Sequence, residues 1–137
     1  MKKLILLLVI LLVPSALFAG MKLEGNKAII PLEEVSDSEA HYYSMNVDNT
    51  NVRFFVLKSK DGVIRAAFDA CDVCYHSGKG YSQDGDFMVC NNCGMRFHST
   101  RINIVSGGCN PSPLERTIEG QNLIISMDAI KSGKKYF

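Results

Sequence analysis

The sequence predicts a small, mainly β domain made of antiparallel strands that carries two metal-binding CxxC loops. Three observations support this fold class. Short runs rich in β-branched and aromatic residues are separated by turns, no segment after the N-terminal run keeps a long helical period, and four of the five cysteines form two CxxC pairs. A chain of 137 residues has room for one such domain.

Residues 1–19 are expected to form a secretory signal and to lie outside the domain. Two lysines precede a wholly apolar run at 4–13, and the segment ends at the small residue Ala19. An uncleaved membrane anchor is the alternative, although the run is shorter than the roughly 20 apolar residues of a spanning helix and meets Pro14. We therefore expect residues 20–137 to be a single cysteine-rich domain outside the cytoplasm, in the periplasm or an equivalent compartment.

The charge balance excludes nucleic acid as a partner. The chain carries 15 basic and 14 acidic side chains, and loss of the signal with its two lysines leaves 13 against 14. Binding to nucleic acid needs a basic stripe, which the sequence does not contain. The composition does not specify an oligomeric state.

The domain is expected to begin with an edge strand. Residues 26–32 have the pattern of a short strand, and we place it at an edge because Pro31 has no N–H group to donate to a ladder. Residues 36–51 are rich in Asp and Asn, which favour turns, and their start has the composition of a helical turn. No strand register can be assigned there.

A β-hairpin is predicted next. Residues 52–59 and 63–69 are β-rich runs, and the pair Asp61-Gly62 between them provides the positive φ that a tight hairpin requires. This hairpin leads directly into the first CxxC pair.

Further strands are predicted after that pair. Residues 86–90 read as a strand that ends at a cysteine, and the alternating segment 95–105 forms one strand or two. Residues 115–127 predict a second hairpin that turns at Glu119-Gly120.

The cysteine spacing is typical of a four-thiolate metal site. Cys71 and Cys74 form one CxxC pair, and Cys90 and Cys93 form another after fifteen intervening residues. Each pair lets a tight turn aim two sulfurs at one metal, and Gly94 lets the backbone curl so that amide N–H groups point at them. The alternative is disulfide bonding, which is common in exported proteins. An odd number of cysteines and the tiny loops that such bridges would close argue against it.

Other cysteine chemistry and hydrolytic catalysis find no support. A c-type haem needs a histidine after the second cysteine of its motif, and a thioredoxin-like dithiol needs a βαβ context. The sequence contains no Ser/His/Asp grouping and no HExxH run. We therefore expect an electron carrier or metal-binding protein in preference to an enzyme.

A fifth thiol and two histidines are further candidates for ligands. Cys109 lies in "GGCNPSPLE", where two glycines and a proline describe a fixed turn. It is either a buried thiol of that turn, or part of a loop that closes over the metal and offers a further sulfur. His76 and His98 lie near the CxxC pairs and are capable of ligation, although a surface position is the plainer reading for both.

The segments "AAFDACDVCY", "GKGYSQDGDFMVCNNCGMRF" and "GGCNPSPLE" resemble the FtrD-like membrane iron-sulfur-containing proteins, and the likeness runs from residue 24 to residue 137. The resemblance implies an iron-sulfur cluster held by the cysteines. It also implies a role in electron transfer or metal handling beside a membrane iron uptake system. The partner would then be a membrane permease or a redox protein. The membrane portion of the larger family members has no counterpart in this chain.

A more distant likeness is to Rieske domains, because the run from Cys90 to Phe97 is similar to their second cluster loop. Cys93 stands where a Rieske histidine would be, and Val73 takes the place of the other one. A two-iron cluster held by four thiolates would have a lower potential than a Rieske centre. The fold class is thus a Rieske-like domain, with a rubredoxin- or zinc-ribbon-like domain as the alternative.

Several metals are compatible with these residues. The signal lacks a twin-arginine pair, so the chain is expected to cross the membrane unfolded and to take up its metal outside. This favours copper, zinc or iron captured after export over a preassembled iron-sulfur cluster. Zinc would be structural, whereas copper or an iron-sulfur cluster would permit one-electron transfer.

Overall fold

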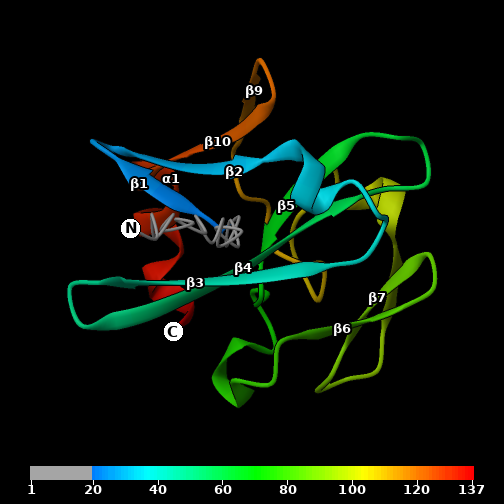
Figure 1. Cartoon of the computed structure of the whole chain (residues 1–137). Coiled ribbons are helices and arrows are strands. Elements are labelled where there is room, and N and C mark those ends of the chain that lie inside the picture. The colour runs from blue at the N-terminus through cyan, green and yellow to red at the C-terminus, as the bar shows by residue number, and fades with distance from the viewer. Residues whose placement is uncertain (1–19) are drawn as a thin grey trace, which may run out of the picture.

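The computed structural model describes residues 20–137, so the expected signal at 1–19 lies outside the described residues. The mainly β prediction is confirmed (Figure 1). No helix within the described part of the chain is long and apolar enough to cross a membrane. The strands are β1 (Lys22–Glu24), β2 (Lys27–Pro31), β3 (His41–Val47), β4 (Thr50–Lys58), β5 (Ile64–Phe68), β6 (Tyr81–Asp84), β7 (Phe87–Cys90), β8 (Arg96–His98), β9 (Thr117–Glu119) and β10 (Asn122–Ser126).

The strands form three antiparallel sheets. Their orders are β1-β2-β10-β9, β3-β4-β5 and β6-β7-β8. Short helical elements join or follow them: η1 (Leu32–Val35), η2 (Tyr75–Ser77), η3 (Ser99–Arg101), α1 (Met127–Ser132) and η4 (Gly133–Tyr136).

The β3-β4-β5 sheet is the middle layer, because its central strand is buried on both faces. Successive side chains of a strand point to opposite faces. In β4, Phe54 and its same-face neighbours join one hydrophobic core, whereas Phe55 and Leu57 join another. In β5, Phe68 and Ala67 are divided between the cores in the same way.

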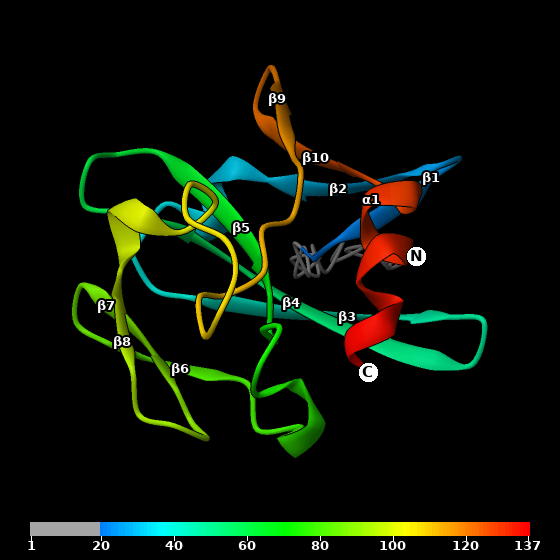
Figure 2. The ribbon, with the colours of Figure 1, turned by 180° about the vertical axis from the view of Figure 1, so that it is seen from behind.

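The first core lies between the middle sheet and the four-stranded sheet. β2 and β10 contribute Ile30 and Ile125, and α1 contributes Ile130, all three fully buried. Ser126 caps α1 by accepting a hydrogen bond from the Ala129 N–H at 3.1 Å. The C-terminal segment thereby packs against β4 (Figure 2).

The second core lies between the middle sheet and the β6-β7-β8 sheet, and it contains two of the cysteines. Cys71 and Cys90 are 1% and 2% exposed, and they pack with Tyr81, Met88 and Phe97. The β6-β7-β8 sheet is therefore the element that brings the second CxxC pair to the first.

Both predicted hairpins are confirmed. β4 pairs with β5 around Gly62, which has a φ of 83°, and β9 pairs with β10 around Gly120, which has a φ of 59°. The predicted strand before Cys90 is confirmed as β7. The segment 95–105 gives one strand, β8, which passes into the helical turn η3.

The edge position of the first strand was wrong. β2 pairs with β1 on one side and with β10 on the other. Pro31 is tolerated because it is the last residue of β2, beyond the point at which β1 stops pairing at Ile29.

Two strands have no counterpart among the predicted ones. β3 occupies the polar segment 36–51, and it turns into β4 through Asp48 and Asn49, both with positive φ. β6 precedes β7, and their hairpin turns at Gly85. The pair Asp84-Gly85 is the same signal that predicts the turn at Gly62, so the β6–β7 hairpin could have been found from the sequence.

We predict that Gly133→Ala destabilises the domain. Gly133 has an ordinary helical conformation, but a Cβ atom there would overlap the ring of Phe68 in the first core. Overpacking of this kind costs about 1–3 kcal/mol. Urea unfolding measures the loss. Gly20→Ala is the control, since nothing lies within 4 Å of its Cβ position, and a change there as large as that at Gly133 would contradict the packing.

Candidate metal centre

Three loops and the end of β7 bring the five cysteines together. Figure 2 shows the loops after β5 and between β7 and β8 at the same end of the domain. The first follows β5 and carries Cys71 and Cys74, and the second connects β7 to β8 and carries Cys93. The third is the "GGCNP" turn after η3, with Cys109. Cys90 is the last residue of β7 and enters from the strand.

The sulfurs form two overlapping groups. Cys71, Cys74 and Cys109 make one group, and Cys74, Cys90 and Cys93 make the other. Within each group all sulfurs lie within 4.8 Å of one another. Cys74 is therefore the shared member of a five-thiol cluster, which we call the cysteine cluster.

The sulfur spacing suits a shared metal better than a disulfide. All five cysteines are free thiols, and the sulfurs of Cys74 and Cys109 are 3.8 Å apart. A disulfide bond is about 2.05 Å long. Two thiolates on one tetrahedral metal, each bound at about 2.3 Å, lie about 3.8 Å apart.

This arrangement differs from a single tetrahedron made by the two CxxC pairs. Cys71 shares no group with Cys90 or Cys93. Its group consists of Cys71, Cys74 and Cys109. The reason is that Cys71 and Cys90 enter the second core from different sheets, with the side chain of Tyr81 close to both. Cys109 thus belongs to the cluster and is not merely part of a distant turn.

The two CxxC loops use their amide groups differently. The Cys74 N–H donates to the sulfur of Cys71 at 3.2 Å, as expected for a thiolate-stabilising turn. At the second pair, the Gly94 N–H donates to the carbonyl oxygen of Cys90 at 2.8 Å. Gly94 has a φ of 75°, so this position does need glycine, but its N–H closes the turn and does not bond a sulfur.

Tyr81 connects the third loop to the first. Its hydroxyl donates to the carbonyl oxygen of Cys109 at 2.6 Å, and it also lies within reach of the Cys71 sulfur. One proton serves only one acceptor at a time, and the short contact favours the carbonyl. Burial, and then the neighbouring Cys71, raise the pKa of Tyr81, so its hydroxyl stays a donor.

The thiols have different acidities. Burial acts to raise the pKa of Cys71, but the nearby Tyr81 hydroxyl and hydrogen bonds from the backbone of Cys74 and Val73 outweigh it and hold that pKa below its ordinary value. Hydrogen bonding with Cys93, together with burial and contact with Cys74, raises the pKa of Cys109 to about 12. Cys109 is therefore a protonated thiol at neutral pH in the absence of a metal.

Asp69 fixes the backbone beside the cluster. Its carboxylate accepts a hydrogen bond from the Tyr81 N–H at 2.7 Å and lies 3.5 Å from the Arg53 guanidinium. Burial raises the pKa of Asp69 against the effect of these partners. A Cβ atom at Gly80 would overlap this carboxylate, and Gly80 has a φ of 63°, so only glycine fits the turn.

Tyr136 joins the first and third loops from outside the cluster. Its hydroxyl donates to the Asp72 carboxylate at 2.7 Å and accepts from the Ser112 hydroxyl at 2.9 Å. Asp72 lies between Cys71 and Cys74, and Ser112 follows the "GGCNP" turn. The C-terminal segment thereby positions two of the three cysteine-bearing loops.

The two candidate histidines lie apart from the sulfurs. Among residues 20–137, neither belongs to a group able to hold a metal. His76 is exposed and its ring lies 3.8 Å from that of Tyr75. His98 bonds the hydroxyl of Thr100 at 2.9 Å and caps η3.

Tyr81 and Tyr136 are the residues that sequence analysis missed. A signal existed for the first, because the Asp84-Gly85 turn fixes a register that pairs Tyr81 with Cys90. Tyr136 carries no such signal, since its partner Asp72 lies 64 residues away in the chain.

Comparison with known proteins gives a match to one family. A family model described as membrane iron-sulfur containing protein FtrD-like matches residues 35–137. The match includes all five cysteines and both tyrosines of the site. No curated protein matches the sequence significantly.

A solved structure is also similar. It is a quaternary ammonium Rieske monooxygenase, CntA, in complex with an inhibitor, with 17% sequence identity and a TM-score of 0.48. The match covers 72% of this chain and 30% of the monooxygenase chain, so this chain spans less than a third of that protein's length.

We predict that Tyr136→Phe weakens metal binding about tenfold and leaves the fold intact. The change removes the hydroxyl that joins two cysteine loops and should cost about 1 kcal/mol in unfolding. Competition between the protein and a chelator for Co²⁺, followed by the thiolate absorption bands, measures the affinity.

Tyr75→Phe is the matched control for Tyr136→Phe. It makes the same chemical change next to Cys74, and the Tyr75 hydroxyl has no hydrogen-bond partner in the described part of the chain. Equal affinities in the two variants would contradict the positioning role.

We predict that the metal affinity of the protein rises more steeply with pH than that of Cys109→Ala. A thiol with a pKa near 12 is protonated between about pH 7 and pH 9, and binding as a thiolate releases its proton. The metal-binding constant of the unaltered protein then rises by one more factor of ten per pH unit than that of Cys109→Ala. Zn²⁺ competition titrations across this range measure the slopes, and equal slopes would show that Cys109 is not a ligand.

Proposed function

The chain belongs to the FtrD-like family of membrane iron-sulfur containing proteins, and we propose that its cysteine cluster holds a two-iron iron-sulfur centre that carries single electrons. The observation that carries this proposal is the pair of overlapping thiol groups that share Cys74. Two groups of three donors favour two metal ions over one.

The donor set fits such a centre. Iron-sulfur clusters are held by cysteine thiolates, and the cluster offers five thiols without a histidine or carboxylate among its grouped members in residues 20–137. The mostly buried position also fits, because Cys71 and Cys90 lie in the second core. A structural zinc ion prefers four sulfurs in one closed group, which the two groups of three do not provide.

The bound centre would supply reversible one-electron chemistry. The protein's own residues would set how readily it is reduced. The Cys74 N–H donates to the Cys71 sulfur, and the Tyr81 hydroxyl lies next to that sulfur, so both stabilise negative charge on it. Such contacts raise a reduction potential, whereas the thiolates and burial lower it.

The surface around the cluster supports an encounter with a redox partner. Cys93 is exposed, and the apolar side chains of Val73 and Met95 are 59% and 52% exposed at the tips of the two CxxC loops. Their placement gives a partner direct access to one edge of the cluster. The partner we propose is the reducing or oxidising component of a membrane iron uptake system, such as its permease, located outside the cytoplasm.

Copper handling is the second candidate. Cuprous ions accept two or three thiolates, so each group of three sulfurs also suits one of them. The protein would then carry metal and not electrons. Like the iron-sulfur proposal, this one describes a metal-binding protein and no catalyst.

We predict that the exported protein contains stoichiometric iron and that Cys74→Ala lowers the iron content more than the loss of any other single cysteine. Cys74 belongs to both groups, so its removal takes away the one sulfur placed near both metal positions. Elemental analysis gives the metal content. Visible absorption and electron paramagnetic resonance, before and after reduction, identify a two-iron centre by a broad charge-transfer band and a rhombic reduced signal.

Cys93→Ala is the matched control, because it is exposed and leaves the other group of three complete. It should retain more iron than Cys74→Ala. A metal-free protein whose thiols are all oxidised, or a Cys74 variant with full iron content, would rule out the proposal. Copper with no resonance signal would select the second candidate.

A further inference from the structure

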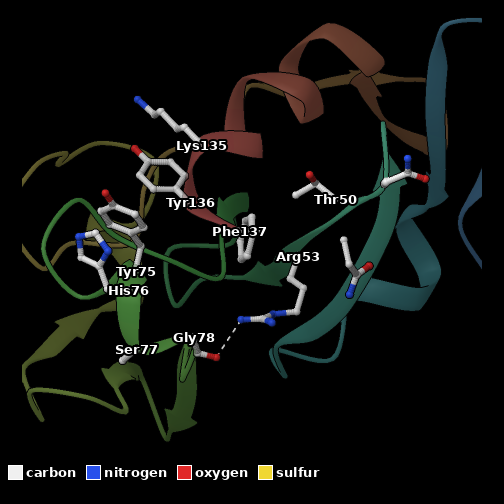
Figure 3. A pocket seen from close by; sticks show the side chains of 11 residues that line it. Thr50, Arg53, Tyr75, His76, Ser77, Gly78, Lys135, Tyr136 and Phe137 are labelled. Carbon is white, nitrogen blue, oxygen red and sulfur yellow. Dashed lines mark hydrogen bonds between the residues drawn. The ribbon is translucent and has the colours of Figure 1, made fainter.

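A cavity of about 590 Å³, whose lining residues Figure 3 shows, lies outside the cysteine cluster and shares lining residues with a small hollow that reaches it. Three chain segments form its walls: the turn and first residues of β4 at 49–53, the segment 75–78 after the first CxxC pair, and the C-terminal residues 135–137. Its volume falls within the range of small-molecule sites, about 300–1,000 Å³.

The side chains that line the cavity carry a net positive charge. Arg53 and Lys135 line it, and no acidic side chain does. Lys135 makes no salt bridge within residues 20–137, and its amino group lies 4.9 Å from the centre of the Tyr136 ring. The lining therefore offers a cation without a carboxylate partner in the described chain.

Arg53 is held in place and still has donors to spare. Its guanidinium donates to the Gly78 carbonyl at 3.0 Å, faces Asp69 at 3.5 Å and lies 5.1 Å from the centre of the Phe137 ring. A guanidinium has five N–H donors, and these contacts use two in the described structure. The remaining donors suit a carboxylate, which accepts two parallel hydrogen bonds from such a group.

One wall of the cavity is aromatic. The rings of Tyr75 and Tyr136 meet edge to face at 5.8 Å, and Phe137 lies between this pair and Arg53 (Figure 3). The opposite side is polar, with Thr50 and the amides of two asparagines. A ligand with a flat apolar part and a charged end would match both sides.

The cavity shares a wall with the cysteine cluster. Arg53, Tyr75 and Phe137 also line a small hollow that reaches Cys71, Cys74 and Cys90. Tyr75 directly follows Cys74 in the chain. A molecule in the cavity would therefore contact side chains that also line the hollow beside the sulfurs.

We propose that this cavity binds a small aromatic carboxylate, with the carboxylate on Arg53 and Lys135 and the ring against the wall of Tyr75, Tyr136 and Phe137. The site requires the folded domain only, so the proposal does not depend on which metal the cysteine cluster holds. Its position predicts that a bound ligand also perturbs that cluster.

The test uses 2-naphthoate as the probe, with the full exported protein in metal-loaded and metal-free forms. The chain has no tryptophan, so the fluorescence of the probe reports binding directly. Saturable binding is expected in both forms. The uncharged 2-naphthylmethanol and the ring-free acetate should bind at least tenfold more weakly than 2-naphthoate. The first lacks the carboxylate and the second lacks the aromatic ring.

Charge-removing variants locate the site. Arg53→Gln should lower the affinity for 2-naphthoate about tenfold, and Lys135→Gln should lower it about threefold. Lys134→Gln is the matched control, because Lys134 faces Asp48 and does not line the cavity, and it should bind as the unaltered protein does. Lys135 is exposed, so its variant tests the proposal even if Arg53→Gln fails to fold.

Four results would overturn the proposal. They are the absence of saturable binding, equal binding of 2-naphthoate and its uncharged analogue, unchanged affinity in both charge-removing variants, and loss of binding in a metal-free form that circular dichroism shows to be folded. In the last case the cavity itself would not be the site. Failure of the iron-sulfur assignment would leave these measurements unaffected.

Discussion

The domain depends on the burial of β4 and β5 on both faces. One face of this middle sheet packs on the four-stranded sheet and the C-terminal helix, and the other packs on the β6-β7-β8 sheet. Cys71 and Cys90 belong to the second of these cores, so the packing that stabilises the fold also delivers two sulfurs to the site. We therefore expect metal binding to stabilise the folded domain.

The local parts of this structure could be predicted from the sequence, and the long-range parts could not. Gly62 and Gly120 mark their hairpins because turns follow local residue chemistry. No local residue pattern indicates that β2 pairs on both sides, since its partner β10 lies far along the chain. The same holds for the site: the CxxC spacing indicates thiolate ligation, but the position of Cys109 beside Cys74 depends on loops 35 residues apart.

The surroundings of the cysteine cluster suggest how one small domain combines a stable centre with access to it. Tyr81 and Tyr136 hold the cysteine-bearing loops by their hydroxyls, on the buried side of the cluster. Cys93, Val73 and Met95 lie on the exposed side. A centre built in this way is rigid where its ligands are anchored and open where the proposed redox partner would approach.

Anomalous diffraction at the iron absorption edge, from crystals of the metal-loaded protein, tests the central claim most directly. We predict two iron positions beside the cysteine cluster, with the sulfur of Cys74 and thiolates of both groups at about 2.3 Å from iron. Electron density for a disulfide between these sulfurs, or a metal bound away from Cys74, would contradict the assignment.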